Sequence, residues 1–249
     1  MTDSVLNVVL GLVASAISAG LGWLAQALRR RRKVERVRAF FGLPAGGECL
    51  IVVNRHASAP SSRSVARSDV YALMELAALV KECGARAELV AHDEVRQGLG
   101  DKGEFCIGGP SSNERTAAHL ASWLPGVEYA PSPDGRVPVL TVGGTEFRHE
   151  DENEPGGGHS FALLARLHPT AGDRPTFLVA GQTAIANHAA VRHLVTDHRK
   201  LARRHTEGGS FVLVLKVVNP KAYGPDVVEL AADVTADALR RTAAAAATA

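Results

Sequence analysis

The sequence is poor in aromatic residues, contains only three cysteines, and lacks two motifs that identify well-known catalytic chemistries. Phe, Trp and Tyr make up 5% of the 249 residues, and no two cysteines have the CxxC spacing of redox and zinc sites. Neither the GxSxG nucleophile elbow nor the GxxxxGK[ST] phosphate loop occurs. A disulfide framework, a GxSxG hydrolase and a P-loop NTPase are therefore excluded, and the cysteines are expected to be small buried residues in a reducing compartment.

Excess charge of one sign is also scarce, because the formal net charge is only +2. Residues 29–38 (RRRRKVERVR) alone carry seven positive charges and one negative, so the rest of the chain is slightly acidic. Nucleic-acid binding usually needs a basic face on the folded domain. No nucleic-acid partner is therefore expected.

The stretch from Val5 to Leu28 contains no charged residue in 24 positions. As a helix it would be about 36 Å long, enough to cross the hydrocarbon core of a bilayer. Basic residues from Arg29 to Lys33 follow directly, which places that end in the cytoplasm and the N-terminus outside. The pattern predicts a single-pass anchor in the cell membrane, with lipid contacts along both stretches; the alternative is an amphipathic or buried helix of a soluble protein.

Small residues recur along one side of this predicted span. Gly11, Ser15 and Ala19 are spaced by four residues, a pattern that allows two transmembrane helices to approach closely. Self-association through this face is therefore a hypothesis. The predicted division of the chain is a short external N-terminus (1–4), a transmembrane helix (5–28), a basic segment and hinge (29–47), a cytoplasmic domain (48–240) and a disordered tail (241–249).

Three stretches of the cytoplasmic part share one form, in which a short apolar run leads through a polar loop into a helical pattern. The apolar runs are residues 48–54, 105–107 and 176–180, and the helices that follow end near residues 83, 123 and 205. Apolar runs of this kind fit parallel strands that are covered on both faces. The predicted fold is α/β, a Rossmann-like three-layer domain with a mainly parallel sheet, and the β-rich insertion at 127–170 is expected to extend that sheet in antiparallel fashion.

The loops after these strands hold the candidate binding residues, because ligands of open parallel sheets bind beyond the carboxyl ends of the strands. Around GGPSSN, a glycine turn followed by a helix start offers free backbone N–H groups and the positive end of a helix dipole. Arginines in the first loop are suited to bidentate contact with phosphate. The candidate ligand-binding residues are Asn54, Arg55, Ser62, Arg63, Gly108, Gly109, Ser111, Ser112, Asn113, Gln182 and Thr183.

Catalytic candidates are few. Glu114 and Asp93 are the carboxylates nearest to the predicted loops and are weak catalytic candidates. Asp93, at the tip of the second strand, is placed to hold a ribose hydroxyl, but capping of the helical turn that follows is the favoured interpretation. The loop after the first strand lacks the GxGxxG fingerprint of dinucleotide binding, so no cofactor is identified. The acidic, histidine-containing loop at 148–159 has no fixed ligand spacing, and no metal site is predicted there.

The strand–GGPSSN–helix form is loosely similar to Rossmann-like nucleotide-processing domains, namely the sugar-nucleotide, TIR-like and deoxyribosyltransferase-like groups. The resemblance covers these turns alone and completes none of their diagnostic motifs. Two functions follow from the pattern: a membrane-anchored sensor or interaction module that binds a nucleotide-like or anionic ligand, or a membrane-tethered enzyme that acts on a nucleotide or nucleoside, as a glycosidase would. A ligand-free scaffold is the third alternative.

Overall fold

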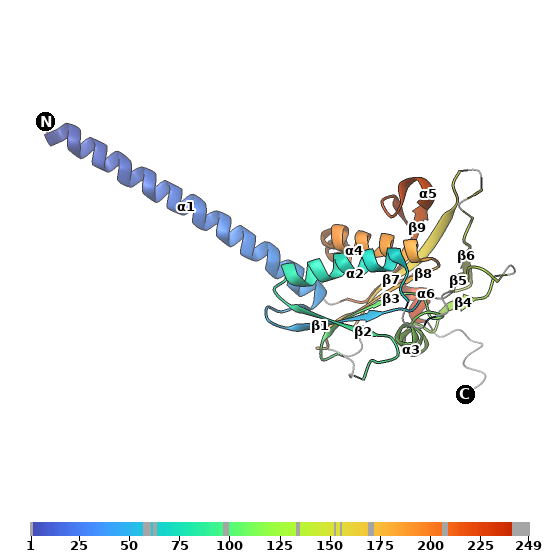
Figure 1. The fold of residues 1–249 in the computed structure, drawn as a ribbon. Helices are drawn as coiled ribbons and strands as arrows, with labels where there is room; N and C mark the ends of the chain where they lie inside the picture. Colours follow the sequence, from blue (N-terminus) through green and yellow to red (C-terminus); the bar gives the residue numbers. More distant parts are fainter. Residues whose placement is uncertain are drawn as a thin grey trace.

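A computed structural model of the chain describes residues 2–56, 61, 64–96, 100–132, 135–151, 153–154, 156–168, 172–205 and 209–240. Within the first helix, the side chains of residues 2–9, 11–14 and 16 lie outside this description. The same holds for the candidate residues Ser62 and Arg63 and for the predicted tail at 241–249. Figure 1 shows a long N-terminal helix that leads into an α/β body.

A seven-stranded sheet forms the centre of that body, in the order β10-β9-β7-β8-β3-β1-β2. Strands β2, β1, β3, β8 and β9 run in one direction, and β7 and β10 run in the other. The predicted α/β fold with a mainly parallel, broadly Rossmann-like sheet is confirmed. The strands are β1 (Glu48–Val53), β2 (Arg86–Ala91), β3 (Gly103–Ile107), β7 (His159–Leu167), β8 (Thr176–Gly181), β9 (Phe211–Val218) and β10 (Val228–Asp233).

Successive side chains of the buried strands point to opposite faces of the sheet and pack in two hydrophobic cores, one on each face. Cys49 and Ile51 of β1 face the first core, whereas Leu50 and Val52 face the second. Helices α2 (Arg67–Glu82) and α4 (Ala184–Arg204) cover the first face, and α3 (Glu114–Trp123) and α6 (Thr235–Leu239) lie on the opposite side (Figure 1). A short helix, α5 (Pro220–Tyr223), follows β9. The sheet therefore lies between two layers.

The predicted insertion at 127–170 divides between two sheets. Strands β4 (Val127–Ala130), β5 (Val139–Val142) and β6 (Thr145–Phe147) form a separate antiparallel sheet, whereas β7 pairs with β8 and β9 inside the main sheet. The stretch at 137–147 contains β5 and β6. It is a tight hairpin because Gly143 and Gly144 both adopt positive φ angles, a conformation in which glycine carries no steric cost.

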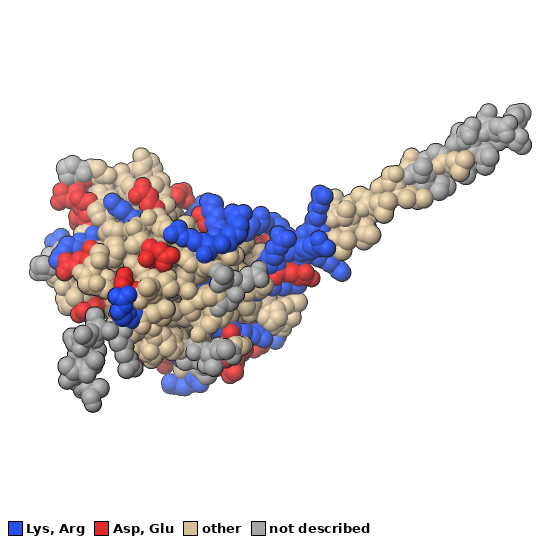
Figure 2. Space-filling view, turned by 180° about the vertical axis from the view of Figure 1, so that it is seen from behind, with Lys and Arg blue, Asp and Glu red and all other residues tan. Residues whose placement is uncertain are grey.

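The first helix, α1 (Thr2–Phe41), runs unbroken through the basic segment. Its last turn belongs to the first core, where Val37, Phe40 and Phe41 are buried. The segment predicted as basic segment and hinge at 29–47 is therefore helical to Phe41, because arginine, lysine and glutamate favour helices and the two phenylalanines gain by burial. Lysine and arginine side chains gather where this helix meets the body (Figure 2).

No helix in the part of the chain whose side chains are described is long and apolar enough to span a bilayer. Much of the predicted span at 5–28 falls on positions with undescribed side chains, so the transmembrane helix stays a prediction.

Candidate functional site

Three neighbouring parallel strands end at the same edge of the main sheet and bring their loops together. Strand β3 pairs with β1 on one side and with β8 on the other, all in parallel. Asn54 follows β1, Gly108 follows β3 and Gln182 follows β8. The candidate ligand-binding residues were predicted on these loops, and the strand order of the sheet makes the three loops neighbours in space.

The turn after β3 requires glycine at its first position. Gly108 has a φ of +100°, and a Cβ built there would lie 2.6 Å from Cβ of Asn54. The turn closes when the N–H groups of Ser112 and Asn113 donate to the carbonyl oxygen of Gly109. Asn113 then caps α3, since its Oδ1 accepts from the N–H of Thr116 at 3.0 Å and its Nδ2 donates to the carbonyl of Ile107 at 2.8 Å. Gly108 and Asn113 therefore shape the loop from beneath.

A cavity of about 640 Å³ opens above these loops. That volume lies within the range of small-molecule sites in proteins. Its walls come from the loops after β1, β3 and β8, from the first turns of α2 and α4, and from the segment between β4 and β5. The residues that line the cavity include Asn54, Arg55, His56, Asp69, Ser111, Tyr129, Arg136, Val137, Thr183 and Asn187.

A buried carboxylate forms part of the cavity wall. Asp69 lies in the first turn of α2 and is 1% exposed. Its Oδ2 accepts from Nδ2 of Asn54 and its Oδ1 accepts from Nδ2 of Asn187, both at 2.8 Å. Burial raises the pKa of Asp69, opposed by these two hydrogen bonds and by the nearby His56 and His188. The triad of Asp69, Asn54 and Asn187 joins β1, α2 and α4 below the cavity.

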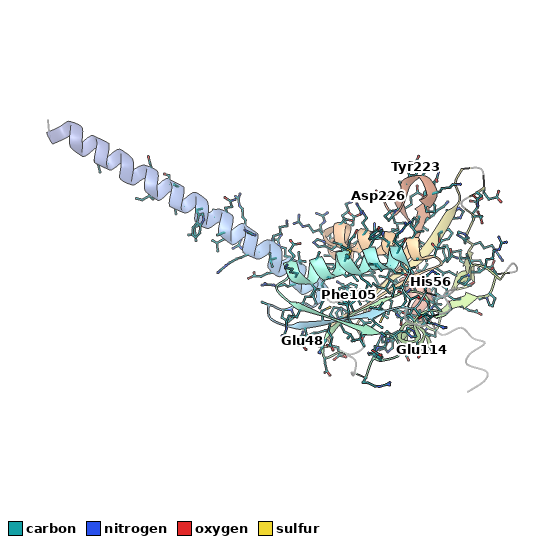
Figure 3. The ribbon with its side chains drawn as sticks, viewed as in Figure 1. Glu48, His56, Phe105, Glu114, Tyr223 and Asp226 are labelled. Atoms are coloured by element: carbon teal, nitrogen blue, oxygen red, sulfur yellow. The ribbon has the colours of Figure 1, made fainter. Side chains whose placement is uncertain are left out.

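The exposed rim of the cavity is cationic. The guanidinium group of Arg55 donates from Nη2 to the carbonyl oxygen of Ser111 at 3.3 Å, so it crosses from the β1 loop to the β3 loop. Arg136 lies on the segment between β4 and β5 and also lines the cavity. His56, labelled in Figure 3, follows Arg55. The cavity therefore has positive side chains at its entrance and a buried acidic group at its floor.

Gln182 attaches the small sheet to the main one. Its Nε2 donates to the carbonyls of Pro138 and Phe147 at 2.9 and 2.8 Å, and its Oε1 accepts from the N–H of Phe161 at 2.9 Å. Thr183 caps α4 by accepting from the N–H of Ala186. These two candidates line the cavity, but their polar groups are already used in holding its walls.

Most of the predicted ligand-binding residues line the cavity, whereas the two catalytic candidates lie outside it. The predicted residues that line the cavity are Asn54, Arg55, Gly109, Ser111, Ser112, Gln182 and Thr183. Glu114 starts α3 with its N–H 3.5 Å from Nδ1 of His92, and neither Glu114 nor Asp93 belongs to the lining. Figure 3 shows Glu114 at α3, away from His56 at the cavity.

Asp69, Asn187 and Arg136 were not predicted. Asp69 was missed because the candidates were taken from the loops after the strands, whereas Asp69 lies in the first turn of α2. An acidic residue soon after a Ser-rich loop was the available signal. Nothing in the sequence indicates a role for Asn187, because its hydrogen-bond partner Asp69 lies 118 residues away in the chain.

A second polar cluster lies beneath α3, at the start of β3. Glu104, Cys106 and His119 bring an oxygen, a sulfur and a nitrogen within 4.8 Å of one another, the arrangement of a possible metal ligand set. Arg115, however, donates to both oxygens of Glu104, at 2.9 and 2.8 Å, and Nε2 of His119 lies 2.7 Å from Oε1. Because the carboxylate is already paired, the cluster is a buried ion-pair network that fastens α3 to the sheet.

Acid is expected to weaken this network. Burial alone would raise the pKa of Glu104, but hydrogen bonds from Arg115, His119 and Cys106 outweigh it and lower the pKa to about 2 from 4.5. The resulting stabilisation is complete above pH 4.5 and is lost as the pH falls towards 2, by about 3 kcal/mol in total. Urea unfolding between pH 6 and 3 should show the wild type and Glu104→Gln converging; a constant difference would contradict the assignment.

A scan against protein-family models gives no match for this chain, and a search of curated proteins finds no relative. The cavity is therefore the feature from which a function is inferred.

Proposed function

We propose that the chain is a membrane-anchored module that binds a small anionic, nucleotide-like ligand in the cavity at the C-terminal edge of its sheet. The observation that carries this proposal is the cavity itself, a space of about 640 Å³ where three parallel strands end. Open parallel sheets bind ligands at this place. The guanidinium groups of Arg55 and Arg136 at the entrance are suited to a phosphate or carboxylate.

Binding is favoured over turnover by the placement of the acidic groups. Glu114 and Asp93 are not in the cavity lining, and both oxygens of Asp69 already accept hydrogen bonds from asparagine side chains. One observation favours an enzyme that acts on a nucleotide or nucleoside: Asp69 is a carboxylate in the cavity wall with a raised pKa, as a general acid requires. Release of free base from a nucleotide by the wild type, abolished in Asp69→Asn, would establish that alternative.

Thermal melting of the full chain in detergent micelles tests the binding function. The compounds are AMP, NAD, ribose 5-phosphate and inorganic phosphate. A ligand at 100 times its dissociation constant adds about 2.7 kcal/mol, which raises the melting temperature by several degrees. Arg55→Ala is expected to reduce that shift. Arg86→Ala is the matched control, because Arg86 is an exposed arginine at the start of β2, the other end of the parallel strands. The absence of a shift with every compound would favour the ligand-free scaffold.

The membrane anchor is the second part of the proposal. It is supported by the uncharged stretch from residue 5 to 28, by the basic residues at 29–33, and by the exposed side chains of Leu21, Trp23 and Leu28 on α1. These features support an orientation with the N-terminus outside and the α/β domain in the cytoplasm. The small residues Gly11, Ser15 and Ala19 provide a face for self-association in the membrane.

Resistance to alkaline carbonate tests the anchor. Membranes from cells that express the full chain should retain it after a carbonate wash, which strips peripheral proteins, because an inserted helix is held by the hydrophobic effect. Replacing Leu21 and Leu24 with aspartate should move the protein to the supernatant, since each charge in the hydrocarbon core costs about 2.5–3.5 kcal/mol. Release of the wild-type chain by carbonate would contradict the proposal.

A further inference from the structure

The floor of the cavity contains a buried acceptor without a donor. Asn54 is 5% exposed, and its Nδ2 is committed to Asp69. Its Oδ1 has no hydrogen-bond partner among the described residues. A buried polar atom left unpaired costs about 1–3 kcal/mol, so a donor that a ligand brought to this acceptor would recover that cost.

The neighbouring carboxylate has unused acceptor capacity as well. Asp69 receives one amide hydrogen bond on each oxygen, whereas an ionised carboxylate offers about four lone-pair sites. The floor therefore presents acceptors from Asp69 and Asn54. An anionic group placed there would be repelled, and a group with two neighbouring donors would be bound.

The rim has the opposite chemistry. Arg55 is exposed and bridges towards the carbonyl of Ser111, and Arg136 lies on the segment from the small sheet. Tyr129 and Val137 also line the cavity and add an apolar wall, which suits the face of a planar ring. A ligand that satisfies all three regions has adjacent hydroxyl groups at one end, an anionic group at the other, and an apolar face beside them.

We propose that the cavity takes a nucleoside 5′-monophosphate with its ribose hydroxyls on the floor, donating to Asp69 and Oδ1 of Asn54, and its phosphate at the rim arginines. The base lies against the wall formed by Tyr129 and Val137. This inference depends on the binding function proposed above and names its ligand class and orientation. A zwitterionic amino acid is the alternative ligand class. Its ammonium group would donate to the floor acceptors, and its carboxylate would bind the rim arginines.

Calorimetric titration of the full chain in micelles tests the orientation with AMP and 2′,3′-dideoxy-AMP. The dideoxy compound keeps the base and the phosphate but removes both floor donors. We expect it to bind at least about 10-fold more weakly than AMP, because the floor acceptors would stay unpaired. Asp69→Asn should weaken AMP by a similar factor and dideoxy-AMP much less. Since the ligand pair is compared on the unmodified protein, the test does not depend on the variant folding.

The outcomes separate this inference from the binding function. Equal affinity for AMP and dideoxy-AMP would overturn the floor assignment and leave the anion-binding function standing. Binding of glutamate without binding of AMP would overturn the nucleotide class in favour of an amino acid. Failure of AMP, ribose 5-phosphate, inorganic phosphate and glutamate to bind would overturn both proposals.

Discussion

Replacing Arg115 with methionine is expected to lower the free energy of unfolding by about 3–5 kcal/mol, as for other buried ion pairs that lose one partner. Arg115 donates two hydrogen bonds to Glu104, whose side chain is 4% exposed. The substitution keeps the aliphatic volume and removes the charge. Among the described residues it leaves His119 and Cys106 as the donors to a buried carboxylate, and desolvation then favours the protonated acid or the unfolded chain.

The ion pair between Arg86 and Glu48 provides the matched control. Its atoms lie at 2.9 Å, but the side chains are 78% and 42% exposed. Arg86→Met should therefore cost less than about 1 kcal/mol in urea unfolding. Adding Glu104→Gln to Arg115→Met should recover part of the lost stability, because the unpaired charge is then gone. A loss below 1 kcal/mol in Arg115→Met would show that the network does not hold α3.

Phe41→Ala should have a comparable effect, about 3–5 kcal/mol, through the first core. Phe41 is fully buried at the end of α1, with ring centroids 5.4 Å from Phe177 and 6.0 Å from Phe105. Removing the ring leaves a cavity between α1 and two central strands. Met74→Ala serves as control, because Met74 is 63% exposed on α2 and its loss should change stability by no more than about 0.5 kcal/mol.

The Phe41 result also decides where the folded domain begins. A domain that starts after a hinge would tolerate the substitution with little change in the urea midpoint. A large loss means that the last turn of α1 is part of the core, so that any fragment used for binding studies has to begin before Val37.

The order of elements could be predicted because each core strand of the parallel half is an apolar run bounded by polar loops. The runs expected at 48–54 and 176–180 correspond to β1 and β8, and the helix expected to end near residue 123 is α3. Alternation of Ile51 with Leu50 and Val52 towards opposite cores follows directly from the two-residue period of a strand. The strands, the helix and the alternation of side chains could be predicted because each is determined by residues that are close together in the sequence.

Features that depend on contacts between distant segments could not be predicted. Strand β7 has an apolar pattern that suits any buried strand, and nothing in it indicates insertion between β8 and β9. The cavity shows the same division: its glycine turn at Gly108 is visible in the sequence, whereas the contact between Asp69 and Asn187 joins residues 118 positions apart. The burial of Phe41 at the end of α1 could not be predicted either, because its ring partners Phe105 and Phe177 lie far from it in the chain.

Hydrogen exchange of the full chain in micelles, with and without saturating AMP, tests whether the nucleotide binds in the cavity, because it locates the ligand on the chain. We expect slower exchange of backbone amides in the loops at 108–113 and 181–187 and at the start of α2. The basic segment at 29–38 and the edge strand β2 should be unchanged. Protection confined to the basic segment would mean that the phosphate binds α1 through charge alone. That result, or unchanged exchange in the cavity loops, would contradict binding of the nucleotide in the cavity.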